Sequence, residues 1–219
     1  MSLPVSFSGQ HVFVLGSGPG SSAPPTSGWA TATVNGSQAL LQGLGLPARP
    51  TLTLMHNTLI KSRLNSNIAA RKVLRGLATG HLVMMDREPS FKHRCLARIR
   101  LWALGYRYDT LTLLDYGSRQ RIIAQMLQQP YDSEQHPSNG IFLALLVLHL
   151  GAASVLMSGF SLSRGGHAYN THNFPREHVN ADQLALQRMA QLGLPVFTND
   201  PVFSVESGLP LLNTGLERQ

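Results

Sequence analysis

The chain has 219 residues with a formal net charge of +7, and 43% of its residues are hydrophobic. This hydrophobic content excludes a disordered chain, and the length suits a single domain with a sizeable core. Its one cysteine, Cys95, excludes an internal disulfide framework and a cysteine-based zinc site. No apolar run reaches the roughly 20 residues of a bilayer span, and no cationic start precedes an apolar run, so we expect a cytoplasmic protein without a secretory signal.

Short apolar runs alternate with helical stretches along the chain. Strands are predicted at 12–15, 30–34, 51–55, 81–85, 110–114, 154–157 and 194–197. Helices are predicted at 58–75, 91–103, 118–128, 140–150 and 181–192, the last capped by Asn180. The polar segment 161–180, rich in glycine and histidine, is predicted to be a lid or loop insertion. This alternation indicates one α/β domain over residues 1–219, Rossmann-like, with a mostly parallel sheet flanked by helices.

Basic residues are concentrated in the middle of the chain. Between Arg49 and Arg121 lie 14 of the 18 Lys and Arg residues but only four acids. A positive surface implies an anionic partner, unless the charges simply solvate two helices. No nucleic-acid motif is recognisable, which favours an anionic acceptor, or a peripheral contact with the inner face of the membrane, over nucleic acid.

The first predicted strand leads into a glycine-rich loop, Gly16-Ser17-Gly18-Pro19-Gly20. Glycines let a backbone approach a phosphate or a sugar closely, and the loop amides can donate hydrogen bonds to it. The loop lacks the Gly-Lys-Ser/Thr ending of a P-loop, and no acid precedes Asp86 to bind the ribose of a dinucleotide. An NAD-linked oxidoreductase is therefore disfavoured, and the loop is predicted either to bind a nucleotide in another way or to form a plain turn.

Other polar residues follow strands or open a helix. Asn35 and Asn57 come directly after the second and third strands, where carboxamides can hydrogen-bond a base or a ribose, although such residues are also common in turns. Ser138, Asn139 and Gly140 open a helix that is apolar on every side and should be buried. The amides at the start of that helix suit a phosphate or a carboxylate, unless Ser138 or Asn139 simply caps it.

Three histidines, His167, His172 and His178, lie within twelve residues. Their spacing, without a cysteine, does not favour a zinc site. His178 differs from the other two because it comes just before the last predicted helix. The positive end of that helix disfavours protonation of the imidazole, which would keep His178 ready to act as a base.

Together these motifs resemble the bacterial lipooligosaccharide sialyltransferases. The first loop is similar to that family's Gly-Asn-Gly-Pro loop, and the longest similar stretch is its Thr-Ser-Gly, helix, Leu-Gly, strand, Ser-Gly block. From about residue 62 to 134 the chain resembles no part of the family. The segments that carry the resemblance are Val14 to Pro19, Val34-Asn35, His56-Asn57-Thr58, Ser138 to Phe160, and His178 with Asp182 and Leu186.

The resemblance implies the sialyltransferase-like variant of the GT-A architecture and a metal-independent, inverting transferase. Such an enzyme moves a sialic-acid-like sugar from a CMP donor to a hydroxyl of a glycan acceptor in lipopolysaccharide biosynthesis, and needs no cofactor besides the activated sugar. His178 would be the general base, and Tyr169 would donate a hydrogen bond to the departing phosphate. The donor-binding residues implied are Gly16, Ser17, Gly18, Pro19, Asn35, Asn57, Ser138, Asn139, Gly140 and Gly159.

The chain also departs from the family. Ser17 stands where the family has Asn, Asn139 where it has Ser, and Ser163 where it has a second phosphate-binding tyrosine. A CMP-linked keto sugar other than sialic acid, such as Kdo, therefore stays open. No Asp-x-Asp motif is present to hold a metal, so Arg164 and the start of the buried helix would join Tyr169 on the departing phosphate. The rival interpretation is a basic Rossmann-like protein that binds a nucleotide or nucleic acid without transferase activity.

Overall fold

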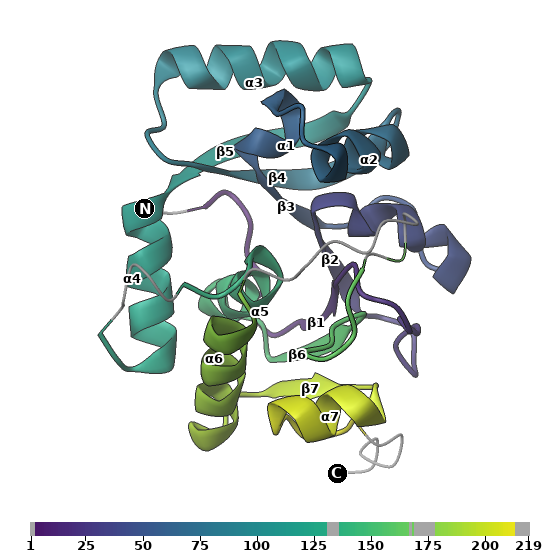
Figure 1. Ribbon diagram of the computed structural model, residues 1–219, viewed down its shortest axis with the longest axis vertical. Helices are drawn as coiled ribbons and strands as arrows, with labels where there is room; N and C mark the ends of the chain where they lie inside the picture. The colour runs from purple at the N-terminus through teal and green to yellow at the C-terminus, as the bar shows by residue number, and fades with distance from the viewer. Residues whose placement is uncertain (1–2, 131–135, 167, 169–177, 213–219) are drawn as a thin grey trace.

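The computed structural model describes residues 3–130, 136–166, 168 and 178–212. Seven parallel strands form one sheet in the order β5-β4-β3-β2-β1-β6-β7, and helices flank both of its faces (Figure 1). The predicted Rossmann-like α/β fold is confirmed. The strands are β1 (His11–Leu15), β2 (Ala30–Val34), β3 (Leu52–His56), β4 (Ala78–Asp86), β5 (Arg107–Asp115), β6 (Ser154–Ser158) and β7 (Val196–Thr198).

The helices divide between the two faces of the sheet. They are α1 (Asn57–Lys61), α2 (Asn65–Leu74), α3 (Phe91–Leu104), α4 (Tyr116–Leu127), α5 (Asn139–His149), α6 (Val179–Gln191) and α7 (Pro201–Ser207), with the short 3-10 helices η1 (Asn35–Leu40) and η2 (Gln42–Leu44). One apolar cluster packs α4, α5 and α6 against the sheet, and a second packs α1, α2 and α3 against the opposite face. As predicted, α5 is buried on every side.

The single helix predicted at 58–75 is two helices, α1 and α2. The chain is extended at Ser62, which ends α1, and at Leu64, which precedes α2. The side chain of Arg71 donates hydrogen bonds to the carbonyl oxygens of Leu59 (2.5 Å) and Ser62 (2.8 Å). A helix leaves its last carbonyls without intrahelical partners, so Arg71 compensates for the break.

In the last third of the chain, one prediction was wrong and one helix was not predicted. The N-cap of α6 is His178, not Asn180, which lies inside the helix. Helix α7 was missed, although Asp200 followed by Pro201 is a typical helix start. The Asp200 carboxylate caps α7 by accepting hydrogen bonds from the amides of Val202 (2.9 Å) and Phe203 (3.3 Å).

The strand order indicates where on the sheet a ligand would bind. From β1 the chain adds β2 to β5 on one side and then returns to add β6 and β7 on the other. In open parallel sheets, ligands bind beyond the carboxyl ends of the strands where this order reverses, which here is between β1 and β6. Among the described residues, no helix is long and apolar enough to cross a bilayer.

Candidate functional site

A cavity of about 780 Å³ opens at the carboxyl ends of β1 and β6. Its volume lies within the range of small-molecule sites. Nine of the predicted site residues line it: Gly16, Ser17, Gly18, Asn35, Ser138, Asn139, Gly140, Gly159 and His178. Pro19 and Asn57 are not among the lining residues, and Tyr169 lies outside the described residues.

The two loops that leave β1 and β6 pack backbone against backbone. The amide of Gly16 donates to the Ser158 carbonyl (2.8 Å) and the amide of Gly18 donates to the Gly159 carbonyl (2.7 Å). A Cβ on Gly16 or Gly18 would lie less than 3.0 Å from the Gly159 carbonyl oxygen. The main requirement for glycine at these two positions is therefore the contact between the loops. The amides of Gly16 and Gly18 are not available to a phosphate, contrary to the expectation from the sequence.

The N-terminus of α5 forms another wall of the cavity. Asn139, Gly140 and Ile141 line the cavity, and the side chain of the N-cap residue, Ser138, makes no capping hydrogen bond. A Cβ on Gly140 would lie 2.6 Å from the ring of Phe160, so glycine lets that ring close over the helix start. The simple cap considered for Ser138 is not formed, and the positive end of the helix faces the cavity.

His178 and His136 meet at the cavity wall. Their ring centroids are 4.7 Å apart, with the rings tilted by 53°, and both residues line the cavity. The side chain of His178 makes no capping hydrogen bond to α6. The buried carboxylate of Asp182, one turn along α6, accepts a hydrogen bond from the Ser138 amide (2.6 Å). This bond ties the helix that carries His178 to the start of α5.

The two asparagines after β2 and β3 have different surroundings. Asn35 lines the cavity and has a left-handed backbone (φ 50°), so it is both the turn residue and the cavity residue that the sequence suggested. Asn57 is buried, and its side-chain amide donates to the Asp86 carboxylate (2.9 Å). Because this bond directs Asn57 away from the cavity, its neighbours His56 and Thr58 line the wall instead.

Sequence reasoning missed a basic and aromatic group from β3 and α4. The imidazole of His56 lies 2.7 Å from the Tyr116 hydroxyl, and Arg119 is buried with its guanidinium 5.1 Å from the centre of the Phe142 ring. Arg119 also donates a hydrogen bond to the Pro137 carbonyl. Its position gave a usable signal, because Arg119 shares a helical face with the buried apolar residues of α4.

Helix α7 anchors the start of the predicted lid. The Glu206 carboxylate accepts hydrogen bonds from the Leu162 amide (2.6 Å) and from the hydroxyls of Ser161 (3.2 Å) and Ser163. Burial raises the pKa of Glu206, but these hydrogen bonds outweigh it and hold the pKa below its ordinary value. Arg164 pairs with Asp200, which places it in the anchor rather than among the residues expected to stabilise a departing phosphate.

The pKa of His56 lies below its ordinary value of 6.5, first because of burial and then because of the positive charges of Arg119 and Lys61. Burial also lowers the pKa of His81. The unfolded chain therefore binds more protons than the folded chain just below pH 6.5, so the free energy of unfolding should fall as the pH falls through that range.

Urea unfolding between about pH 7.5 and 5 tests this expectation, because the carboxylates titrate mainly below that range. His56→Gln should flatten the pH dependence, whereas His149→Gln, at an exposed residue of α5, should leave it as in the parent protein. An equal slope in the parent and in His56→Gln would contradict the assignment.

Asp182 is the one carboxylate among the described residues that line the cavity. No group of three or more His, Cys, Asp or Glu side chains in the described part of the chain could hold a metal ion. The other titratable side chains that the described residues bring to the wall are His56, Tyr116, Arg119, His136 and His178. This composition suits an anionic ligand.

No protein-family profile matches the sequence, and no curated protein matches it. Its fold is similar to those of solved sialyltransferases. A variant of the sialyltransferase Cst-II in complex with CMP aligns with a TM-score of 0.58 at 11% identity, over 91% of this chain and 86% of that one. The monofunctional α-2,3-sialyltransferase Cst-I from Campylobacter jejuni aligns with a TM-score of 0.58 at 11% identity, over 96% and 82%. Cst-II from Campylobacter jejuni in complex with cytidine-5'-monophosphate aligns with a TM-score of 0.55 at 12% identity, over 93% of this chain and 85% of that one. The chain therefore has a sialyltransferase-like fold.

Proposed function

We propose that the protein is an inverting glycosyltransferase that moves a sialic-acid-like sugar from a CMP donor to a hydroxyl of a glycan acceptor. The observation that carries this proposal is the convergence, on one cavity at the switch point of the sheet, of the α5 N-terminus, Arg119 and His178. The first two suit an anionic donor, and the third is a base suited to neutral pH. Two of the structurally similar sialyltransferases were solved with CMP bound, which supports the choice of nucleotide.

The reaction needs two kinds of assistance. The bond between sugar and phosphate breaks with oxocarbenium character while the acceptor hydroxyl attacks from the opposite face. His178 takes the proton of that hydroxyl as general base. The departing CMP phosphate would be stabilised by donors at the cavity wall, the first amides of α5 and Arg119, joined by the hydroxyl of Tyr169 as the family resemblance implies. The donor sugar is sialic acid or a related keto sugar such as Kdo.

The first test is nucleotide selectivity. The carboxamides of Asn35 and Asn139 line the cavity and can hydrogen-bond the edge of a pyrimidine. Isothermal titration calorimetry with CMP, AMP, GMP and NAD should therefore give the lowest Kd for CMP. Absent binding of CMP, or equal binding of all four ligands, would remove the transferase proposal and favour the rival nucleotide-binding or nucleic-acid-binding protein.

The second test concerns metal dependence. The chain has no Asp-x-Asp motif, and positive groups rather than paired carboxylates surround the expected phosphate site. EDTA should therefore leave donor hydrolysis and transfer unchanged. Loss of activity with EDTA, restored by manganese or magnesium, would show that a metal takes part in the reaction.

A further inference from the structure

The outer face of α3 carries large apolar side chains in solvent. Phe91 is 84% exposed, Ile99 61% and Trp102 83%. Together with the half-buried Cys95 they recur at intervals of four, four and three residues, which places them along one stripe of the helix about 16 Å long. The opposite face of α3 already packs on the sheet through Ala97, Leu101 and Leu104. The stripe is therefore a second apolar face that the fold leaves uncovered.

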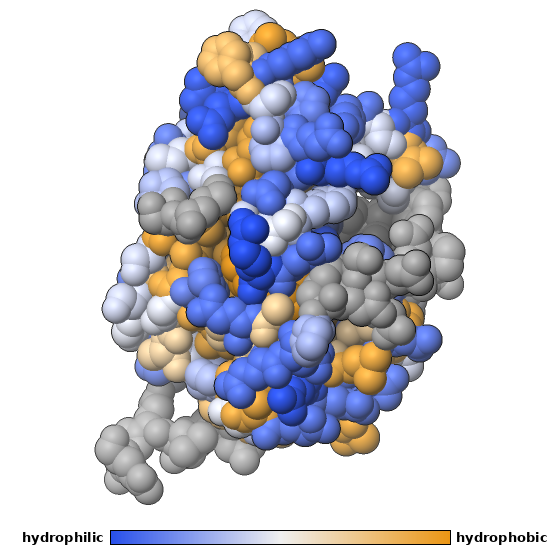
Figure 2. All heavy atoms as spheres, turned by 90° about the vertical axis from the view of Figure 1, so that its left-hand side faces the viewer, coloured by the Kyte–Doolittle hydropathy of each residue, from blue (hydrophilic) through white to orange (hydrophobic). Residues whose placement is uncertain are grey.

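Basic residues border this stripe. Helix α3 contains Lys92, Arg94, Arg98 and Arg100 and no acid. By helical spacing, Lys92 lies on one side of the stripe and Arg94 and Arg98 lie on the other. Figure 1 shows α3 lying across the end of the molecule beyond β4 and β5, and in Figure 2 apolar and hydrophilic side chains mix over that same upper end. We call the stripe and its three bordering basic residues the α3 surface.

We propose that the α3 surface docks on the head groups of an anionic lipid bilayer. Apolar side chains that enter the boundary between head groups and acyl chains, flanked by cations that meet anionic lipids, are the features of helices that lie on membranes. A second copy of the chain is a poorer occupant, because two α3 surfaces face to face would bring like charges together. Nucleic acid would use the cations but would leave the aliphatic side chain of Ile99 unused.

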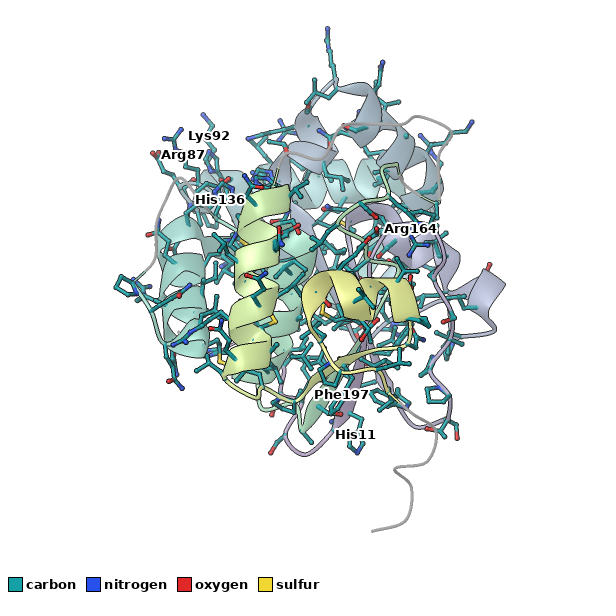
Figure 3. All side chains as sticks on the ribbon, turned by 60° about the horizontal axis from the view of Figure 1, so that its bottom comes forward. His11, Arg87, Lys92, His136, Arg164 and Phe197 are labelled. Carbon is teal, nitrogen blue, oxygen red and sulfur yellow. The ribbon has the colours of Figure 1, made fainter. Side chains whose placement is uncertain are left out.

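The place of α3 in the fold connects this surface to the cavity. Helix α3 begins shortly after β4 ends, at the edge of the sheet where the cavity opens. In the first turn of α3, His93 Nδ1 lies 3.1 Å from the carboxylate of Asp86. The same carboxylate accepts a hydrogen bond from Asn57, whose neighbours on both sides line the cavity. Figure 3 shows Lys92 on the same side of the molecule as His136. The docked membrane would lie beside the cavity mouth, where a transferase would meet a lipid-linked acceptor.

Vesicle binding tests the proposal, and it does so independently of transferase activity. The full chain should sediment with vesicles of equal parts phosphatidylcholine and phosphatidylglycerol, and much less with phosphatidylcholine alone. Lys92→Gln with Arg98→Gln, which removes two positive charges, should lower the partition coefficient by about 25-fold, at about fivefold for each basic side chain. Phe91→Ser with Trp102→Ser should lower it by about tenfold or more. Val202→Ser with Val205→Ser, at exposed residues of α7, is the matched control and should bind as the parent does.

Tryptophan fluorescence reports the contact itself. The chain has two tryptophans, Trp29 and Trp102, so Trp29→Phe leaves Trp102 as the only indole. Its emission should shift to the blue when anionic vesicles are added, and lipids brominated on the acyl chain should quench it. Thermal unfolding confirms that each variant is folded.

Three outcomes would overturn the proposal. One is equal binding to neutral and anionic vesicles by the parent and both α3 variants. Another is an unshifted Trp102 spectrum at a lipid concentration where the protein sediments. The third is failure to bind vesicles while the α3 surface instead mediates self-association or binds single-stranded RNA at physiological salt. Since CMP binding is measured separately, failure of the membrane proposal leaves the proposed transferase to be judged on its own tests.

Discussion

Replacement of His178 by alanine is expected to lower kcat by about 10²–10⁴-fold, the usual contribution of general-base catalysis, while the Kd for CMP changes little. His178 is half-buried, lines the cavity and lies against the ring of His136. Its side chain does not cap α6, so removing it should not release the start of that helix. The expected loss of activity is therefore in the chemical step and not in donor binding.

Two matched variants sharpen this experiment. His178→Gln keeps a polar side chain of similar length but has no basic nitrogen, so it should lose nearly as much kcat as the alanine variant. His149→Ala removes an exposed histidine of α5 and should keep the parent rate. We would measure kcat and Tm on the same samples. Normal turnover per folded molecule in His178→Ala would end the catalytic assignment, whatever happens to Tm.

Replacement of Gly16 by alanine is expected to destabilise the protein by about 1–3 kcal/mol, the usual cost of overpacking, and to remove most CMP binding. The new Cβ would lie less than 3.0 Å from the Gly159 carbonyl oxygen and 2.9 Å from the ring of Phe160. The carbonyl belongs to backbone that is hydrogen-bonded to Gly18, so it cannot move aside freely. The loops after β1 and β6 would separate, and the cavity between them would change shape.

Gly43→Ala is the control for this experiment. Gly43 lies in η2, is exposed, and has no atom within 4 Å of the position that a Cβ would take. It should unfold at the same urea concentration as the parent, or slightly higher, and should bind CMP normally. If Gly16→Ala behaved in the same way in urea unfolding and CMP titration, the contact between the two loops would not be what holds the cavity in shape.

Much of the fold could be predicted because its signals are local. Strands β1, β2, β3 and β6 are short runs in which almost every residue is buried. Gly151, predicted to stop the buried helix, has a left-handed backbone (φ 93°) two residues after the end of α5. The missed helix α7 had a local signal in Asp200 and Pro201, whereas the error between α1 and α2 depends on a distant partner. The break between α1 and α2 is stabilised by Arg71, which bonds carbonyls nine and twelve residues away. No periodicity in the sequence carries that information.

The site was predictable only in part, for the same reason. Polar and glycine residues that follow parallel strands must lie at one edge of the sheet, so the predicted grouping of Gly16, Asn35 and Gly159 rests on topology alone. In the structure these three residues line one cavity. Whether a side chain at this edge faces the cavity depends on which group it hydrogen-bonds. Asn57 turns to the Asp86 carboxylate 29 residues away, and no signal in the sequence distinguished it from Asn35.

By itself, then, the sequence determined the alternation of strands and helices, the burial of α5, and the edge of the sheet at which polar residues gather. It could do so because the burial pattern and the chain direction are local properties of the chain. Only the tertiary structure decided that the glycines of the first loop serve a contact between loops, that Arg119 and His136 join the cavity wall, and that α3 exposes a second apolar face. These depend on which distant groups meet, and the distances between them are set by the packing of the whole sheet and its helices.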